Sequence, residues 1–196
     1  MRELVFLLEE ESAAAMLKTL LPRMLNPGIT PRYMPFEGKQ DLEKQLPKRL
    51  KGYLNPNARF IVLRDQDRDA DCKALKARLA TMCAEAGRCA TSSVRIACRE
   101  LEAFYLADLE AVGRALGIPN LDRHQRAARF RSPDTVVSPS SELAKLCKQV
   151  GYKKVGDSRK IGAVLSIDNE RSPSFRNLLG AIRRHERELL ALPDSS

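Results

Sequence analysis

Acidic residues gather directly after several apolar runs of this 196-residue chain. Apolar runs of this length are typical of buried strands, and a parallel sheet binds its ligands at the carboxyl ends of its strands. If the strands are parallel, the acids meet at one edge, where they repel each other unless a cation lies among them. The acids at the ends of these runs are Glu9 and Glu10, Asp65 and Asp67, and Glu100 and Glu102.

Clustered carboxylates of this kind are ligands for a hard divalent cation, above all Mg²⁺, with Mn²⁺ as a second choice. Residues two apart in an extended chain point the same way, so Asp65 and Asp67 are expected to reach one ion. Such an ion can polarise a phosphate and activate a water molecule for in-line attack.

Acids at these positions also have a simpler interpretation. Carboxylates are common in the first turn of a helix, because they interact well with the helix dipole. Periodicity alone does not separate this interpretation from a metal centre. For Asp71, we favour the role of N-cap of the following helix.

The elements that must position these acids are strands and helices in alternation. Alternation through about residue 117 predicts an α/β fold with a mainly parallel, four-stranded sheet flanked by helices. Pro31 and Pro35 favour an edge position for the second strand, and Ser12 is expected to cap the first helix. The predicted strands are residues 3–8, 29–36, 59–64 and 93–98, and the predicted helices between them are 13–25, 41–54 and 72–86.

The character of the chain changes after residue 117. Residues 120–140 are polar and rich in Arg, Ser and Pro, and helical patterns return from Ser141. We therefore predict an α/β core over residues 1–117, and a basic loop followed by a helical C-terminal extension over 118–196 that packs on the core.

Composition favours an anionic partner and excludes a membrane span. The net charge is +9 with a pI near 9.5, and no apolar run approaches the roughly 18 residues that cross a bilayer. The five cysteines include no CxxC pair, and the N-terminus has no signal-peptide pattern. We expect reduced thiols and a cytoplasmic location.

Glu9 after the first predicted strand and Asp65-Gln66-Asp67 after a later one resemble the pattern of the Toprim superfamily. More closely, five short motifs, in order, resemble a bacterial Toprim-like family, domain of unknown function 4276, related to the overcoming-lysogenization-defect nucleases. The motifs are Leu7-Leu8-Glu9-Glu10, Asp65-Gln66-Asp67, Glu100-Leu101-Glu102-Ala103-Phe104, Tyr152-Lys153-Lys154 and Ser172-Pro173-Ser174-Phe175.

The resemblance implies roles for the acids. A glutamate after the first strand acts as general acid or base, or shares the metal. In this superfamily it is usually followed by Gly, whereas here Glu10 follows Glu9, so either of the two is the key acid. Asp65 and Asp67 would hold Mg²⁺. The remaining pair, Glu100 or Glu102, would complete a second metal position or orient the first.

The resemblance also implies roles for basic residues. Lys154, and less directly Lys153, would neutralise the phosphate in the transition state, although a solvated loop is an equally simple interpretation of both. Arginines of the polar segment would contact a nucleic-acid backbone without reading its sequence. These arginines are Arg123, Arg126, Arg129 and Arg131.

The leading hypothesis is a metal-dependent nuclease acting on DNA or RNA. The resemblance implies the effector of a bacterial defence system, compatible with a homodimer. The chain has no GxxxxGK[ST] motif, so an ATPase would be a separate partner. The alternative is a catalytically weak binding or regulatory subunit, which Glu10 in place of Gly favours; a third hypothesis is phosphotransfer on a small substrate.

Overall fold

The computed structural model describes residues 1–69 and 71–193. Within them, four parallel strands form one sheet in the order β2-β1-β3-β4. The predicted α/β fold is confirmed, and Pro31 and Pro35 lie in an edge strand as expected. The strands are β1 (Arg2–Leu8), β2 (Ile29–Pro35), β3 (Ala58–Asp65) and β4 (Ser92–Ala97).

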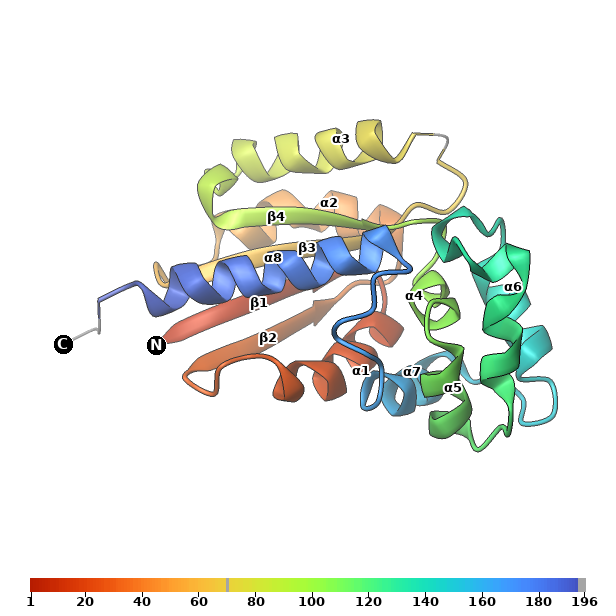
Figure 1. The fold of residues 1–196 in the computed structure, drawn as a ribbon. Coiled ribbons are helices and arrows are strands. Elements are labelled where there is room, and N and C mark those ends of the chain that lie inside the picture. The colour runs from red at the N-terminus through yellow and green to blue at the C-terminus, as the bar shows by residue number, and fades with distance from the viewer. Residues whose placement is uncertain (70, 194–196) are drawn as a thin grey trace.

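Helices cover both faces of this sheet (Figure 1). Helices α2 and α3 lie on one face, α1 and α8 on the other, and α4 to α7 gather towards the carboxyl ends of the strands. The helices are α1 (Glu11–Leu20), α2 (Lys39–Lys51), α3 (Cys72–Glu85), α4 (Glu102–Leu106), α5 (Leu109–Leu116), α6 (Pro139–Leu146), α7 (Lys154–Gly162) and α8 (Pro173–Leu190).

The inner part of β1, residues 4–8, is apolar at every position because both of its faces are covered. Leu4 and Phe6 pack into the core beneath α1 and α8, whereas Val5 and Leu7 pack into the core beneath α2 and α3. Successive side chains of a strand point to opposite faces, so a strand covered on both faces must be apolar at every position.

Helix α7 crosses α1 at very short range. A Cβ atom on Gly162 would lie 2.4 Å from the carbonyl oxygen of Met16. Close by, the hydroxyl of Thr19 donates to the carbonyl of Arg159 at 2.8 Å. The absence of a side chain at Gly162 therefore sets the position of α7, and with it the position of Lys154 at the start of that helix.

Helix α8 is fixed to the sheet by a chain of polar contacts. The Ser93 hydroxyl lies 2.7 Å from Nε2 of His185, and Nδ1 of His185 lies 3.0 Å from Glu188. Arg59 of β3 donates to the same Glu188 carboxylate at 3.1 Å. His185 is fully buried, and burial lowers its pKa, so the neutral ring is favoured.

Several local expectations were wrong. Glu10, not Ser12, is the N-cap residue of α1, and the Ser12 hydroxyl donates to the Glu10 carboxylate. The polar segment after residue 120 contains short 3₁₀ turns, and its Phe130 is fully buried in the main core. All five cysteines are free, in line with the expectation of reduced thiols.

Within the described residues, no helix has the length and apolar character that a bilayer crossing requires.

Candidate metal centre

Strands β3 and β4 remain paired just beyond their carboxyl ends. The amide of Gln66 donates to Ala97 at 2.9 Å, and the amide of Asp67 donates to Arg99 at 2.7 Å. Asp67 and Arg99 have φ angles of 54° and 65°, a left-handed conformation that is costly for residues with a side chain. The expectation of an extended chain through Asp67 was therefore wrong, because the backbone turns there to keep this pairing.

Asp65 is the centre of the acidic group. It ends β3, and only 8% of its surface is exposed. Burial raises its pKa well above the usual value, and the nearby charges of Glu10, Glu9 and Glu102 raise it further, while Lys154 opposes them. The structure thus brings acids from three of the predicted positions around one buried carboxyl group.

Glu9 and Glu10 both belong to this group. A carboxylate oxygen of Glu9 accepts the backbone N–H of Asp65 at 3.0 Å. Burial raises the pKa of Glu9, and repulsion from Asp67 and Glu10 adds to the effect. Glu10 instead accepts the ammonium of Lys154 at 2.7 Å. The two adjacent acids therefore have different partners, although both charges act on Asp65.

Glu100 and Glu102 are separated by the turn into α4. Glu102 is fully buried, and one of its oxygens accepts the hydroxyl of Tyr152 at 3.2 Å. Its other oxygen is buried without a hydrogen-bond partner in the described chain, and burial raises its pKa. Glu100 accepts the amide of Ser140 in the first turn of α6 at 2.6 Å. Its carboxylate thus anchors α6.

Lys154 begins α7 and contributes the positive charge of the group. Burial alone would lower its pKa, but the hydrogen bond to Glu10 and the charges of Glu102 and Asp65 raise it. The neighbouring Lys153 is exposed, and its backbone N–H is capped by Asp157 at 2.7 Å. Of the two ammonium groups, that of Lys154 is therefore the one paired with a predicted acid in the described chain.

The oxygen-rich donor set fits a hard divalent cation. Several carboxylates crowd around the buried Asp65, and a cation among them would relieve their repulsion. In the described part of the chain, however, no three Asp, Glu, His or Cys side chains stand close enough together to hold an ion as they are. Lysines pair with two of the acids instead, Lys154 with Glu10 and Lys39 with Asp67 at 3.0 Å.

Sequence reasoning missed Arg64, which is only 2% exposed. Its guanidinium lies 3.0 Å from Asp69, 3.5 Å from Glu43 and 3.8 Å from Glu9. It therefore supports the loop after β3 from the face opposite Asp65. An arginine inside an apolar strand, directly before the acidic motif, is the signal that could have revealed it. The cap expected at Asp71 is confirmed, since its carboxylate accepts the amide of Lys73 at 2.7 Å.

The four arginines expected to bind nucleic acid lie in the segment before α6. Arg129 pairs with Glu142 at 2.9 Å and stacks over Phe130, while Arg123, Arg126 and Arg131 are exposed. Within residues 1–69 and 71–193, no hydrogen bond or ion pair joins these arginines to the predicted carboxylates.

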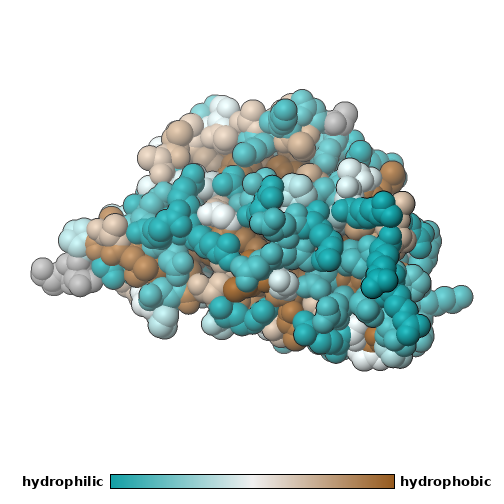
Figure 2. Space-filling model, in the orientation of Figure 1, coloured by the Kyte–Doolittle hydropathy of each residue, from teal (hydrophilic) through white to brown (hydrophobic). Residues whose placement is uncertain are grey.

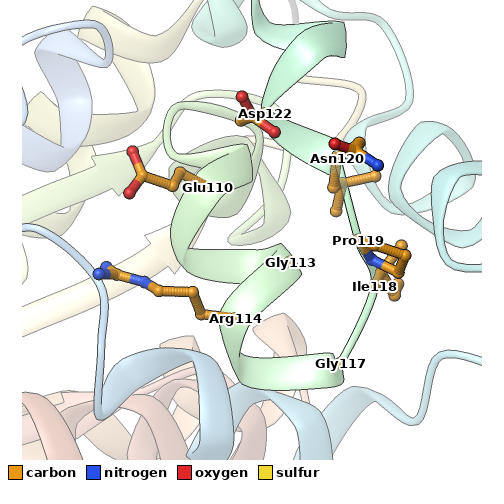
Figure 3. Close-up of a pocket in the computed structure, with 9 residues that line it drawn as sticks. Glu110, Gly113, Arg114, Gly117, Ile118, Pro119, Asn120 and Asp122 are labelled. Carbon is orange, nitrogen blue, oxygen red and sulfur yellow. The ribbon is translucent and has the colours of Figure 1, made fainter.

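A pocket of about 560 Å³ lies elsewhere, at the C-terminal end of α5 (Figure 3). Its wall is formed by α5 and the loop that follows, with Glu110 and Arg114 on the helix and Pro119 and Asn120 on the loop. The predicted site residues do not line this pocket, so the acidic group is a feature of the sheet edge and not of this hollow.

Comparison with known proteins places these features in a family context. The family model described as "Domain of unknown function (DUF4276)" matches residues 8–183. The C-terminal region of the Burkholderia pseudomallei OLD protein is similar in structure, with a TM-score of 0.55 and 16% identity over 94% of this chain and 98% of that chain. The C-terminal region of the Xanthomonas campestris pv. campestris OLD protein has a TM-score of 0.47 and 17% identity over 95% and 96% of the two chains. No curated protein matches the chain.

Proposed function

This chain belongs to the DUF4276 family, and from this premise we propose that it is a metal-dependent nuclease that hydrolyses phosphodiester bonds of DNA or RNA. The observation that carries the proposal is the buried Asp65 among Glu9, Glu10 and Glu102, with Lys154 beside them. The resemblance of these motifs to Toprim nucleases supports it, and the fold shared with the Burkholderia pseudomallei OLD C-terminal region is compatible with it.

In this proposal Asp65 and Asp67 hold a divalent cation, Mg²⁺ or Mn²⁺, and Glu102 provides a further ligand. A cation held there would polarise the phosphate and make a nearby water molecule easier to deprotonate. Glu102 suits this role because one of its oxygens is buried and has no hydrogen-bond partner in the described chain. Tyr152 holds the other oxygen and so orients the carboxylate.

Glu9 is the proposed general base. Its raised pKa, caused first by burial, suits a group that takes a proton from the attacking water near neutral pH. The backbone N–H of Asp65 fixes one oxygen of Glu9 and leaves the other for the water. Glu10 is less suited, because Lys154 and Ser12 already donate to its two oxygens.

Lys154 is proposed to stabilise the negative charge that develops on the phosphate. Its ammonium is held at the edge of the acidic group by Glu10. A preorganised positive charge in such a half-buried place stabilises a transition state more than it would in water. The start of α7, which is the positive end of its helix dipole, adds to this field.

The test is cleavage of labelled single-stranded and double-stranded DNA and RNA, with Mg²⁺ or Mn²⁺, by the wild type, Asp65→Ala and Lys154→Ala. We expect metal-dependent cleavage that falls by at least about a hundredfold in both variants. Asp71→Asn is the matched control, because it keeps the cap of α3 and should retain full activity. Equal cleavage by the wild type and Asp65→Ala would remove Asp65 from the mechanism.

A catalytically weak binding or regulatory subunit is the second candidate. The observation that favours it is the pairing of Glu10 and Asp67 with lysines. Thermal unfolding with and without Mg²⁺ or Mn²⁺ discriminates between the two, since an ion that binds the folded state must raise its stability. A chain that cleaves nothing and gains no stability from either metal would support this second candidate.

The resemblance also supports two further parts of the proposal, a role as the effector of a bacterial defence system with a separate ATPase partner and a homodimeric assembly. The five free cysteines support a third part, a cytoplasmic location.

A further inference from the structure

The outer edge of β4 borders a groove of about 210 Å³. Strand β4 is at the edge of the sheet, so no strand of the described chain pairs with its outer side. The walls of the groove come from the first two turns of α3 and of α8, which flank β4 in Figure 1. The groove is therefore an opening between elements that are fixed by the core.

Three cations line this groove without a carboxylate partner. Lys73 and Lys76 of α3 are exposed, and their side chains make no hydrogen bond or ion pair with any described residue. Arg95 of β4 donates Nε to the carbonyl of Asn177 at 2.9 Å and Nη1 to that of Val94 at 2.8 Å. These two bonds orient the guanidinium and leave its other terminal nitrogen for a ligand.

The single acid in the lining does not balance this charge. Asp134 accepts the hydroxyl of Ser172 at 2.5 Å and the amide of Ser174 at 2.8 Å. Both of its carboxylate oxygens are therefore hydrogen-bonded to the start of α8. Burial lowers the pKa of Arg95, and the like charge of Arg184 lowers it further. Uncompensated positive charge in a half-buried groove attracts an anion.

Part of the groove is apolar. Val94 and Ile96 of β4, together with Pro173 of α8, contribute carbon surface to the lining. Figure 2 views this side of the molecule, where hydrophilic side chains cover α8 and small apolar spots show between hydrophilic side chains below α3. A ligand that combines a flat apolar body with an anionic group matches both parts, and a nucleotide has this character.

The groove begins next to the acidic group. Cys98, which directly follows β4, lines it. The next residue, Arg99, is the one whose carbonyl accepts the amide of Asp67. A nucleic-acid strand with one phosphodiester at Asp65 and Asp67 would therefore reach the groove with a neighbouring nucleotide.

We propose that this groove is a nucleotide subsite for the strand that the acidic group cleaves. One unpaired nucleotide lies over Val94 and Ile96, with its phosphate at Lys73, Lys76 and Arg95. A groove of about 210 Å³ has room for one unpaired base but not for a duplex, so the proposed subsite selects single-stranded nucleic acid. This inference rests on the proposed nuclease function and adds to it a substrate class.

The first test measures binding of short labelled single-stranded DNA and RNA, and of a duplex, to the full chain in the presence of a chelator. The variant is Lys73→Gln with Lys76→Gln, and the control is Lys48→Gln with Lys51→Gln, which removes the same charge from the exposed surface of α2. We expect the groove variant to bind single strands about tenfold more weakly, with a salt slope smaller by about 2. Its KM should rise while kcat is unchanged.

The second measurement uses native thiols. Cys72 lines the groove, whereas Cys89 is exposed outside it. A bound single strand should slow alkylation of Cys72 by a maleimide several-fold and leave Cys89 unaffected. Equal protection of both thiols, or of neither, would contradict the subsite.

The outcomes separate the two proposals. If the wild type cleaves nucleic acid but the groove variant and the α2 control bind alike, the subsite is wrong and the nuclease proposal stands. If the wild type neither binds nor cleaves, the nuclease proposal fails and the subsite fails with it. If the groove variant changes only the sedimentation of the protein, the groove is an interface with a protein strand and the subsite is again wrong.

Discussion

At the scale of single residues, the acidic group is a local conflict that the fold maintains. Asp65 is buried beside three other carboxylates. Its pKa is raised because burial and these neighbouring charges disfavour the ionised form. Function commonly requires such an arrangement at a cost to stability. A residue whose charge destabilises the fold without metal should be replaceable with a gain in stability.

We therefore expect Asp65→Asn to raise the free energy of unfolding by about 1 kcal/mol in chelator at neutral pH. Burial raises the folded-state pKa of Asp65 well above the ordinary value of 3.8, so stability is lost as pH rises from that value through the raised pKa. Asparagine does not ionise and so loses no stability as pH rises. The stability that Asp65→Asn gains over the wild type should therefore grow with pH. Thermal unfolding at about pH 4 and about pH 8 measures it.

In saturating Mg²⁺ the wild type should instead be more stable than Asp65→Asn, because the ion stabilises only the wild type. Asp71→Asn is the control and should change little in either condition. A variant less stable than the wild type at about pH 8 in chelator would show that Asp65 is not crowded by charge.

Arg99 is a second residue under local strain, with a φ angle of 65°. We expect Arg99→Gly to raise the free energy of unfolding by about 1 kcal/mol, because glycine adopts this conformation without steric cost. Arg99→Ala removes the guanidinium but keeps the strain, so it isolates the backbone effect. Denaturant unfolding of both variants is the measurement, and equal stabilities would refute a strained backbone at this position.

The sequence identified which acids gather but not how each one is used. The acids followed apolar runs, and the carboxyl ends of parallel strands coincide, so their common location was predictable. The roles of Glu100 and Glu102 were not, because the helical turn between them directs one to α6 and the other to the acidic group. The left-handed turn at Asp67 depends on Arg99, which is distant in sequence and gave no local signal.

At the scale of elements, the crossing of α1 and α7 positions the lysine of the site. Gly162 lies against the backbone of Met16, so α7 cannot move outward without separating Lys154 from Glu10. The strands and the edge position of β2 could be predicted from apolar runs and proline positions. The crossing of α1 and α7 could not be predicted, because the two residues in close contact, Met16 and Gly162, are about 146 positions apart in the sequence.

We expect Gly162→Ala to lower the free energy of unfolding by about 2 kcal/mol, since the added Cβ would overlap the Met16 carbonyl. Cleavage should fall as well, because Lys154 moves with α7. Gly156→Ala in the same helix is the matched control; nothing lies within 4 Å of its added Cβ, and alanine should stabilise the helix by up to about 1 kcal/mol. Thermal unfolding and the cleavage assay provide the two readouts. Equal effects at both glycines would contradict the close crossing.

His185 ties α8 to the sheet and gives this contact a pH dependence. Burial lowers its folded-state pKa below the ordinary value of 6.5, so its contribution to stability is complete above that pH and is lost as pH falls through the lower folded value. We expect His185→Gln to cost about 2 kcal/mol at neutral pH, and the difference from wild type to shrink on acidification. Chemical unfolding between about pH 5 and about pH 7.5 measures it, and a constant difference would exclude titration of His185.

At the scale of the whole molecule, the chain is a basic protein with an acidic centre. The net charge is +9, yet the edge of the sheet presents carboxylates. The surrounding positive charge would draw a polyanion to the surface, and only a cation in the acidic group would let a phosphate approach the carboxylates. In the proposed function, the basic surface thus attracts the nucleic acid and the acidic group at the sheet edge carries out the cleavage.

We expect nucleic-acid binding to weaken by at least about tenfold between about 50 mM and about 200 mM salt, because phosphate contacts release counterions. The fall should be similar for different sequences of one length, since backbone contacts carry no sequence information. Fluorescence anisotropy over a salt series is the measurement. Affinity that is independent of salt would argue against recognition through the basic surface.

The assembly of the site from Glu9, Asp65, Glu102 and Lys154 has a consequence for protein synthesis. The parallel sheet pairs non-local segments, and domains of this size fold as units while the chain emerges from its N-terminus. A nascent chain that has released β1 to β4 already carries the acids but still lacks Lys154 and the α7 helix that holds it. The proposed site therefore cannot be complete before α7 has been translated and has packed against α1.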